Sequence, residues 1–130
     1  MNFTDYKTQK ADPLVIYVAD TIEAQVQGLQ GVLKLPYNSG MLFVYPEPTY
    51  ASFWMYNTFI DLDIAFIDDN YNVLSIKKLD SHDTRHVGCD DIPYRYALEM
   101  NRGWFQDNDI TVGSNVAELL TSDKLVAITP

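Results

Sequence analysis

Cysteine is almost absent from this sequence, since Cys89 is the single one in 130 residues. One cysteine cannot form an intramolecular disulfide, so the cysteine pairs typical of small secreted domains are missing. The first residues also lack the basic segment and apolar run of a signal peptide. We therefore expect a cytoplasmic protein, and a viral protein made in a host cytoplasm is a second setting compatible with the same pattern.

Long hydrophobic runs and basic residues are scarce as well. No stretch approaches the ~18 apolar residues that a membrane-spanning helix requires. Lys and Arg total 9 against 18 Asp and Glu, which gives a formal net charge of −9. Such a surface repels phosphate backbones and anionic lipid, and its best basic patch is only Lys77-Lys78. We expect neither nucleic acid nor membrane as a partner, but a small molecule or a protein of unknown identity.

Motifs with an established mechanism are also missing. The chain has no P-loop, no G-x-G-x-x-G and no G-x-S-x-G. His82, His86 and Cys89 are residue types that bind zinc, in the spacing H-x3-H-x2-C, but no second cysteine pair accompanies them. Because the surrounding residues are typical of a loop, we interpret the three as part of a polar surface with a free thiol. We expect no metal and no cofactor.

The residues that are present predict one globular domain over residues 1–130, because 47% of them are hydrophobic. Apolar and β-branched segments separated by turn residues predict strands at 14–19, 41–45, 52–56, 59–67, 73–79, 94–100 and 124–129. A short helix is expected after Asp20 as N-cap, with Ile22, Val26 and Leu29 on one face. The pattern predicts a mostly β (α+β) fold, a small antiparallel barrel or sandwich-like sheet with one or two short helices.

Residues 59–67 show the clearest alternation of apolar and polar positions. Four residues fall on one face and are expected to be buried: Ile60, Leu62, Ile64 and Phe66. Asp61 and Asp63 fall on the other face, and Asp61 is expected to be largely exposed. Two carboxylates so placed can share proton transfer or hold a hard cation, or they can simply form a solvated strand face.

A candidate site lies in and beside this segment. Trp54 belongs to an aromatic run, and aromatic walls with a few polar groups are typical of small-ligand pockets, although ordinary core is the alternative. Asn57 and Thr58 can donate and accept hydrogen bonds, or can cap a strand bend. Glu99 interrupts an apolar strand, where burial would raise its pKa. The candidate ligand-binding residues are Trp54, Asn57, Thr58, Asp61, Asp63 and Glu99.

Several short motifs follow one another in an order that resembles a known family. They are Gly28-Leu29, Gly40-Met41-Leu42-Phe43, Phe53-Trp54-Met55, Asn57-Thr58, Leu62-Asp63 and Leu98-Glu99. This order resembles the domain of unknown function 192 family over about residues 14–116. The resemblance implies a small, mostly-β domain with a closed or partly closed sheet and no established reaction. The chain departs from the family pattern at Gln30-Gly31-Val32, where Met and a nearby Arg are usual, and at Tyr56, where Lys is common.

The resemblance assigns signature positions to Phe53, Trp54, Met55, Asn57, Thr58, Asp63 and Glu99. The leading hypothesis is a small accessory or ligand-binding domain with an unknown ligand. A hydrolase or lyase that uses Asp63 and Glu99 as acid and base is an alternative, which a cleft holding both carboxylates within ~5–9 Å would favour. A structural or assembly protein, for example in a viral particle, is a third hypothesis. Whether the protein is an enzyme stays open at this point, with binding preferred.

Overall fold

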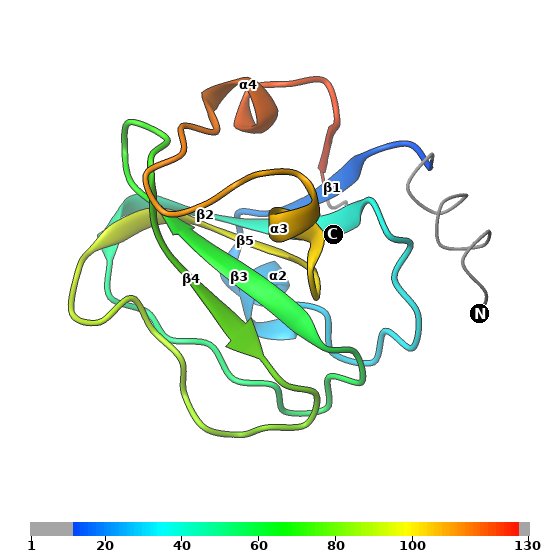
Figure 1. Cartoon of the computed structure of the whole chain (residues 1–130). Coiled ribbons are helices and arrows are strands. Elements are labelled where there is room, and N and C mark those ends of the chain that lie inside the picture. The colour runs from blue at the N-terminus through cyan, green and yellow to red at the C-terminus, as the bar shows by residue number, and fades with distance from the viewer. Residues whose placement is uncertain (1–11, 128–130) are drawn as a thin grey trace.

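The computed structural model describes residues 12–127, and its centre is a six-stranded mixed sheet (Figure 1). The strands are β1 (Val15–Ala19), β2 (Ser39–Thr49), β3 (Leu62–Ile67), β4 (Val73–Leu79), β5 (Tyr94–Asn101) and β6 (Leu125–Ala127). The helices are α2 (Ile22–Gln27), α3 (Trp104–Asp107) and α4 (Ala117–Leu120). Across the sheet the strands follow the order β4-β3-β5-β2-β1-β6.

The mostly β fold class is confirmed; of the two arrangements expected, the structure has a sheet and no closed barrel, and the expected antiparallel pairing holds for three of its five strand pairs. The sheet is open, with β4 and β6 at its two edges. β1 pairs in parallel with β2 and with β6, whereas β2–β5, β5–β3 and β3–β4 are antiparallel. β1, α2 and β2 form a crossover unit, the kind of connection that parallel neighbours require. The described residues contain three helices, one more than the sequence pattern predicted.

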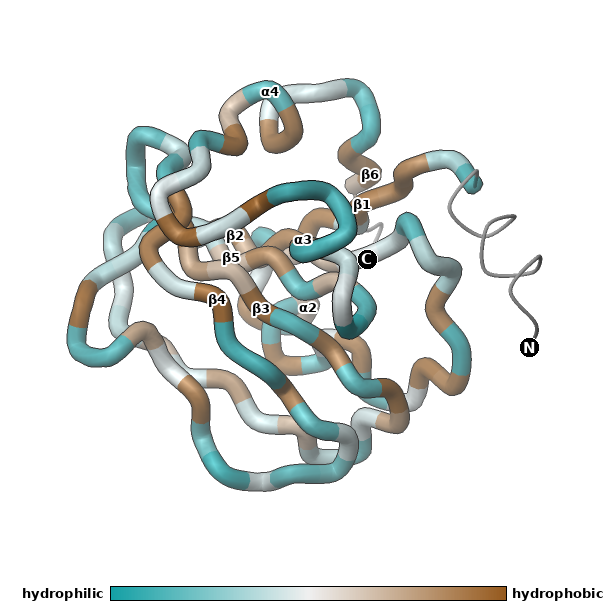
Figure 2. Tube along the Cα trace, in the orientation of Figure 1, coloured by the Kyte–Doolittle hydropathy of each residue, from teal (hydrophilic) through white to brown (hydrophobic). Residues whose placement is uncertain are grey.

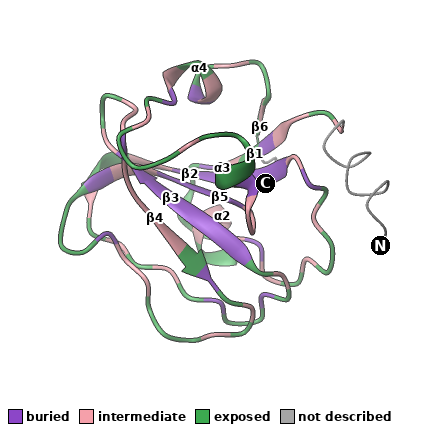
Figure 3. Ribbon diagram, in the orientation of Figure 1, coloured by how far each residue is buried: buried purple, intermediate pink, exposed green. Residues whose placement is uncertain are grey.

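Both faces of the sheet are covered, which explains why β3 is buried along its whole length (Figure 3). On one face, α3 and α4 pack their Trp104 and Leu120 against Leu98 of β5. On the other face, α2 and the irregular segments around it cover Phe43 and Ile64. Figure 1 shows α2 on the opposite side of the sheet from α3. Two core clusters therefore share one sheet between them.

The burial predicted for the even positions of residues 59–67 is confirmed within β3, although the odd positions of the strand are buried as well. Leu62, Ile64 and Phe66 are fully buried and Asp61 is exposed. Ile60 is only half-buried, because the strand begins two residues later at Leu62. In β5, Tyr96, Leu98 and Met100 contribute to one core cluster and Ala97 to the other.

A glycine allows β2 and β5 to pair in their observed register. Gly40 lies opposite Met100 in the β2–β5 ladder. A Cβ atom at Gly40 would collide with the backbone carbonyl of Glu99 and with the sulfur of Met100. Any larger residue there would push the strands apart, so this close approach fixes the backbone around Glu99.

The aromatic segment at 52–56 does not form the predicted strand. Phe53 makes one isolated bridge with Val87, exchanging two backbone hydrogen bonds of 2.8 Å each. The Met55 N–H donates to the Asp83 carbonyl at 2.8 Å. The segment thus pairs with the loop at 80–93, which Figure 2 shows as mainly hydrophilic at the bottom of the view, and lies outside the sheet.

β2 is longer than the sequence predicted, because it continues through Pro46 and Pro48 to Thr49. The β2–β5 ladder is irregular between Val44 and Thr49, so the prolines lie where no regular N–H pairing is required. Within residues 12–127, none of the helices is long and apolar enough to cross a membrane.

α2 begins one residue later than expected. Thr21 is the N-cap in place of Asp20, and its Oγ1 accepts a hydrogen bond from the Ala24 N–H at 3.1 Å. Leu29 beyond the helix is buried, but Ile22 and Val26 are 76% and 70% exposed. The apolar face of α2 is therefore only partly covered by the rest of the domain.

Candidate functional site

A cavity of about 390 Å³ lies on the face of the sheet that α2 covers. Its walls come from α2 and the turn after it, from β2 and β5, and from the segment at 51–58. Its aromatic side chains are Phe43, Tyr45, Phe53 and Trp54. Its polar side chains include Gln25, Thr58, His86 and Glu99. Mostly apolar walls with a few polar groups, at this volume, are typical of small-molecule sites.

Glu99 forms the buried polar part of this cavity. In the sheet it lies opposite Met41 of β2 and Ile64 of β3, so its side chain is on the α2 face. The residue is only 5% exposed. Burial raises the pKa of its carboxyl group to about 8, because little solvent stabilises the ionised form.

No hydrogen bond or ion pair joins the Glu99 carboxyl to another residue within the described part of the chain. In the same residues, no side-chain oxygen or nitrogen is both sealed from solvent and without a partner. The Glu99 oxygens must therefore reach the cavity surface. A buried acid that faces a cavity and lacks a protein partner is available to a ligand.

Gln25 and Thr58 present hydrogen-bond acceptors to the cavity. The Gln25 amide donates from Nε2 to the carbonyls of Ala19 at 3.1 Å and Val44 at 2.9 Å. Both of its donor hydrogens are used, so Oε1 is the atom left for other contacts. The Thr58 hydroxyl donates to the Tyr56 carbonyl at 3.2 Å and likewise retains its lone pairs.

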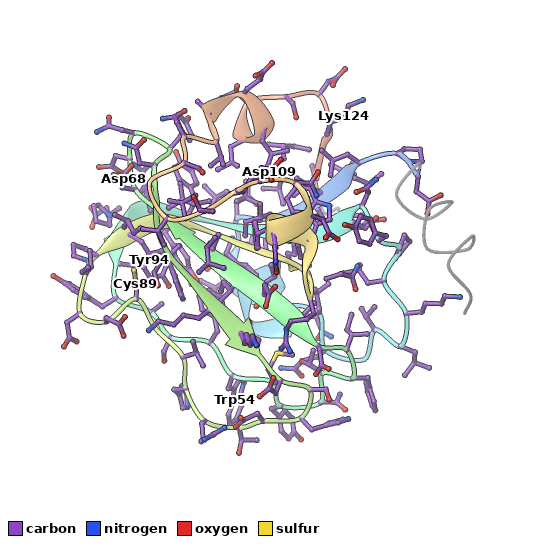
Figure 4. All side chains as sticks on the ribbon, viewed as in Figure 1. Trp54, Asp68, Cys89, Tyr94, Asp109 and Lys124 are labelled. Atoms are coloured by element: carbon purple, nitrogen blue, oxygen red, sulfur yellow. The ribbon has the colours of Figure 1, made fainter. Side chains whose placement is uncertain are left out.

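Trp54 lies at the exposed side of the cavity, below the sheet in the view of Figure 4. Its ring stacks on Tyr56 with centroids 5.2 Å apart and on His86 with centroids 5.5 Å apart. His86 Nδ1 lies 3.0 Å from the Ser52 hydroxyl, within hydrogen-bonding distance. The indole is 46% exposed, so it can change its contacts when a ligand enters without disturbing the core.

Asn57 and Asp61, two further candidates from the sequence, do not line the cavity. Asn57 occupies an exposed turn with φ of 54°, and its carbonyl accepts a hydrogen bond from the Gly31 N–H at 2.9 Å. Asp61 is exposed, and its carboxylate accepts from the Ser81 N–H at 2.9 Å. Both residues hold loops together beside the site.

Asp63 has protein partners on the opposite face of the sheet. Its carboxylate accepts from Arg102 Nε at 3.0 Å and from the Gly103 N–H at 2.8 Å. In the β3–β5 ladder Asp63 pairs with Met100, whereas Glu99 pairs with Ile64. Since neighbouring positions point to opposite faces, Asp63 and Glu99 cannot act on the same bond. The acid–base pair of the alternative enzyme hypothesis is therefore not formed.

The three weak metal candidates do not gather into one site. His82 is exposed and packs edge-on against Phe59, while His86 stacks on Trp54. Cys89 is buried in the core cluster on the α2 face, and burial raises the pKa of its thiol. No group of three or more His, Cys, Asp or Glu in residues 12–127 has the arrangement of a metal site.

A second, more open hollow of about 590 Å³ lies over β4 and the 86–92 segment. Lys77, its main charged group, is already engaged: Nζ donates to the Gly88 carbonyl at 2.6 Å and pairs with Asp90 at 2.5 Å. Its walls provide no buried polar group of the kind that Glu99 provides in the first cavity.

The family profile described as Uncharacterized ACR, DUF192, matches residues 4–117. This chain belongs to the DUF192 family. The match confirms the resemblance seen in the short motifs and extends it toward both ends of the 14–116 core. None of the curated proteins matches the chain.

Two solved structures are similar to this chain in sequence and fold. A protein of unknown function from Novosphingobium aromaticivorans DSM 12444 is 32% identical, with a TM-score of 0.69; the match covers 74% of this chain and 69% of that one. A candidate transcription regulator from Sinorhizobium meliloti 1021 is 26% identical, with a TM-score of 0.72, over 75% of this chain and 76% of that one. The fold is thus shared with other proteins of known structure.

Positions that the resemblance marked as a signature lie on both faces of the sheet. Trp54, Thr58 and Glu99 line the cavity, whereas Asp63 is on the far face of the sheet. Sequence reasoning missed Gln25, which lies on the same helical face as Ile22 and Leu29 by its i+3 and i+4 spacing. A polar residue within an apolar helix face was the signal that could have found it.

Proposed function

We propose that this DUF192 domain binds a small organic molecule in the cavity beside α2, with Glu99 as its polar anchor. The observation that carries the proposal is a carboxyl group that is buried, faces a cavity and has no partner among residues 12–127. Leaving such a group unpaired destabilises a fold, and destabilising features of this kind concentrate at functional sites.

The surroundings of Glu99 support a preformed site. β5 lies between β2 and β3 in the middle of the sheet, so the backbone of Glu99 is hydrogen-bonded to strands on both sides. Phe43 is fully buried beside the cavity and holds its wall in place. Both core clusters share this sheet, which also favours the reading of residues 1–130 as a single domain.

A blocking variant tests the proposal. Val26 lines the cavity but is largely exposed, so Val26→Trp adds a large ring at the entrance without straining the core. Leu33→Trp is the matched control, because Leu33 is similarly exposed and does not line the cavity. A set of fragments with neutral, cationic and anionic members is screened against each chain by thermal shift and by NMR.

We expect some fragments to raise the melting temperature of the wild type and of Leu33→Trp, and to have a much smaller effect on Val26→Trp. Saturation at a hundred times Kd would stabilise the native state by about 2.7 kcal/mol. The proposal is wrong if no fragment binds the wild type at millimolar concentration, or if Val26→Trp binds the same fragments as well as the control does.

A further inference from the structure

We infer that the ligand is a small organic cation, an amine with a compact apolar body whose ammonium group binds Glu99. This inference rests on the proposed function and specifies its ligand class. Three independent features of the cavity lead to it: the kind of polar atoms it presents, the character of its walls, and its charge.

Three polar side chains of the cavity, Gln25, Thr58 and ionised Glu99, present acceptors to it. Gln25 has used both amide hydrogens on backbone carbonyls, and Thr58 has used its hydroxyl hydrogen on another. The ionised Glu99 carboxylate accepts hydrogen bonds only. An ammonium group has three donors and no acceptor, so it matches this set once Glu99 is ionised, whereas a carboxylate or phosphate ligand would find among these three groups no donor other than the proton of neutral Glu99.

The walls and the charge favour a cation as well. Phe43, Tyr45, Phe53 and Trp54 surround the cavity, and aromatic faces attract cations, most strongly where water is excluded. Among the described residues that line the cavity there is no Lys or Arg. The formal net charge of −9 raises the local concentration of cations further.

The size of the cavity sets the size of the ligand. A closed apolar cavity of about 150 Å³ is enough to hold benzene. At about 390 Å³, this cavity has room for one ring with a short aminoalkyl chain. Ile22 and Val26 border it and are largely exposed, so the apolar body of the ligand would also cover part of the free face of α2.

Binding of a cation requires Glu99 to lose its proton. Because its pKa is raised to about 8, Glu99 is mostly protonated at pH 7, and an ammonium ligand would displace that proton to solvent. Two other titratable side chains among the described residues line the cavity, Tyr45 of β2 and His86 of the 80–93 loop; burial raises the pKa of Tyr45. α2 contributes none, and Asp63 lies on the far face.

Three probes of nearly equal shape test the charge preference: phenethylamine, 2-phenylethanol and 3-phenylpropionate. Titration calorimetry is performed with the wild type, with Glu99→Gln and with Asp61→Asn, which changes an exposed carboxylate outside the cavity. We expect the wild type to bind the amine at least tenfold more tightly than the alcohol. Glu99→Gln should lose that preference while keeping its affinity for the alcohol, and Asp61→Asn should match the wild type.

The wild-type chain alone provides a second measurement, which stands even if the Glu99 variant does not fold. At pH 7, titrations in buffers of different ionisation enthalpy should show release of close to one proton per amine bound. Affinity should rise with pH up to about 8 and then level off.

Equal binding of amine and alcohol, or preference for the carboxylate, overturns the cation inference while the pocket remains supported. Absence of proton release overturns it in the same way. Failure of all three probes together with failure of the Val26→Trp test removes the proposed function itself, so the two failures are distinguishable. Failure of the probes when other fragments do bind the pocket overturns only the ligand class inferred here.

Discussion

Two buried carboxyl groups lie on neighbouring central strands of one sheet, and their surroundings differ. Asp63 on β3 receives a guanidinium at 3.0 Å and a backbone N–H at 2.8 Å. Within the part of the chain that the structure describes, the carboxyl group of Glu99 on β5 has no hydrogen-bond or ion-pair partner, and burial raises its pKa to about 8. The first carboxylate connects β3 to the turn after β5. The second leaves its acceptors facing a cavity.

Two carboxyl groups in neighbouring buried strands therefore need not share one role. Asp63 and Glu99 were both predicted as signature positions from the resemblance, and both belong to strands predicted from mostly apolar segments. The sequence alone does not distinguish the two residues, whereas the register of the β3–β5 ladder places their side chains on opposite faces of the sheet. The predictions below test this separation, and their expected effects run from several kcal/mol down to a few tenths.

The largest effect is expected from the pH dependence of Glu99→Gln. Folding raises the Glu99 pKa from 4.5 to about 8, so the native state binds this proton more tightly than the unfolded state does. The stability that the native state gains from binding this proton is therefore present near pH 4.5 and is lost as the pH rises to 8. The amide of Glu99→Gln does not titrate, so this variant keeps its stability as the pH rises. It should be more stable than the wild type at pH 8, by on the order of 3–5 kcal/mol.

Urea unfolding of both chains at several pH values from 4.5 to 8.5 measures that gap. The difference in unfolding free energy between the two chains should decrease steadily as the pH falls, because Glu99 then becomes neutral, like the amide of the variant, in both the folded and the unfolded state. A gap that does not change with pH would mean that Glu99 has a partner or a normal pKa in the folded protein.

The second effect concerns the partner of Asp63. Arg102 pairs with Asp63 and also donates to the carbonyls of Leu62 and Leu79 at 3.2 Å each. Arg102→Leu removes all these bonds and leaves a mostly buried carboxylate with one N–H donor, so we expect a loss of about 2–4 kcal/mol.

Arg85→Leu is the control, since Arg85 forms an ion pair with Asp83 while 84% exposed. Such pairs contribute at most about 1 kcal/mol. Denaturant midpoints of the wild type and the two variants, compared at one pH, measure the difference in stability. If the two variants lose similar stability, the Asp63–Arg102 contact is no more than a surface ion pair.

The sequence predicted the burial of one face of β3 but not of the other. The alternation in 59–67 identified the buried set of β3, because a period of two is a local property of the strand. The alternation could not show that the opposite face of β3 is buried too. That face is covered by α3 and α4, which lie about forty residues further along the chain. Asp63 therefore looked solvated in the sequence and is enclosed in the structure.

The site was predictable in part for the same reason. Trp54, Thr58 and Glu99 carry unusual polarity for their segments and were found from the sequence. The aromatic run around Trp54 predicted a strand, but its backbone bonds go to Val87 and Asp83 in a loop whose position depends on tertiary packing. Gln25 enters the site only through the crossover that joins the parallel strands β1 and β2.

A smaller effect is expected from Asp63→Asn. The amide keeps the shape and one acceptor, but it loses the charge that strengthens the bonds to Arg102 and Gly103. We expect a cost of about 1–3 kcal/mol at pH 7. The sign is opposite to that of the same isosteric change at Glu99, and thermal and urea unfolding of the two variants side by side would show it. Stabilisation by Asp63→Asn would place this carboxylate with Glu99 as a candidate functional group.

The smallest effect is expected from Asp61→Asn, the third carboxylate of the same stretch. Asp61 is exposed, and within residues 12–127 its carboxylate accepts one hydrogen bond, from the Ser81 N–H at 2.9 Å. The Asn oxygen can still accept that bond, and solvent already stabilises the charge that is lost. The cost should therefore be about 0.5 kcal/mol or less. Asp61 and Asp63 stand two residues apart with the same chemistry, so burial and partners alone account for any difference between their variants. Equal and negligible shifts in the two melting temperatures would show that the contacts of Asp63 with Arg102 and Gly103 do not stabilise the fold.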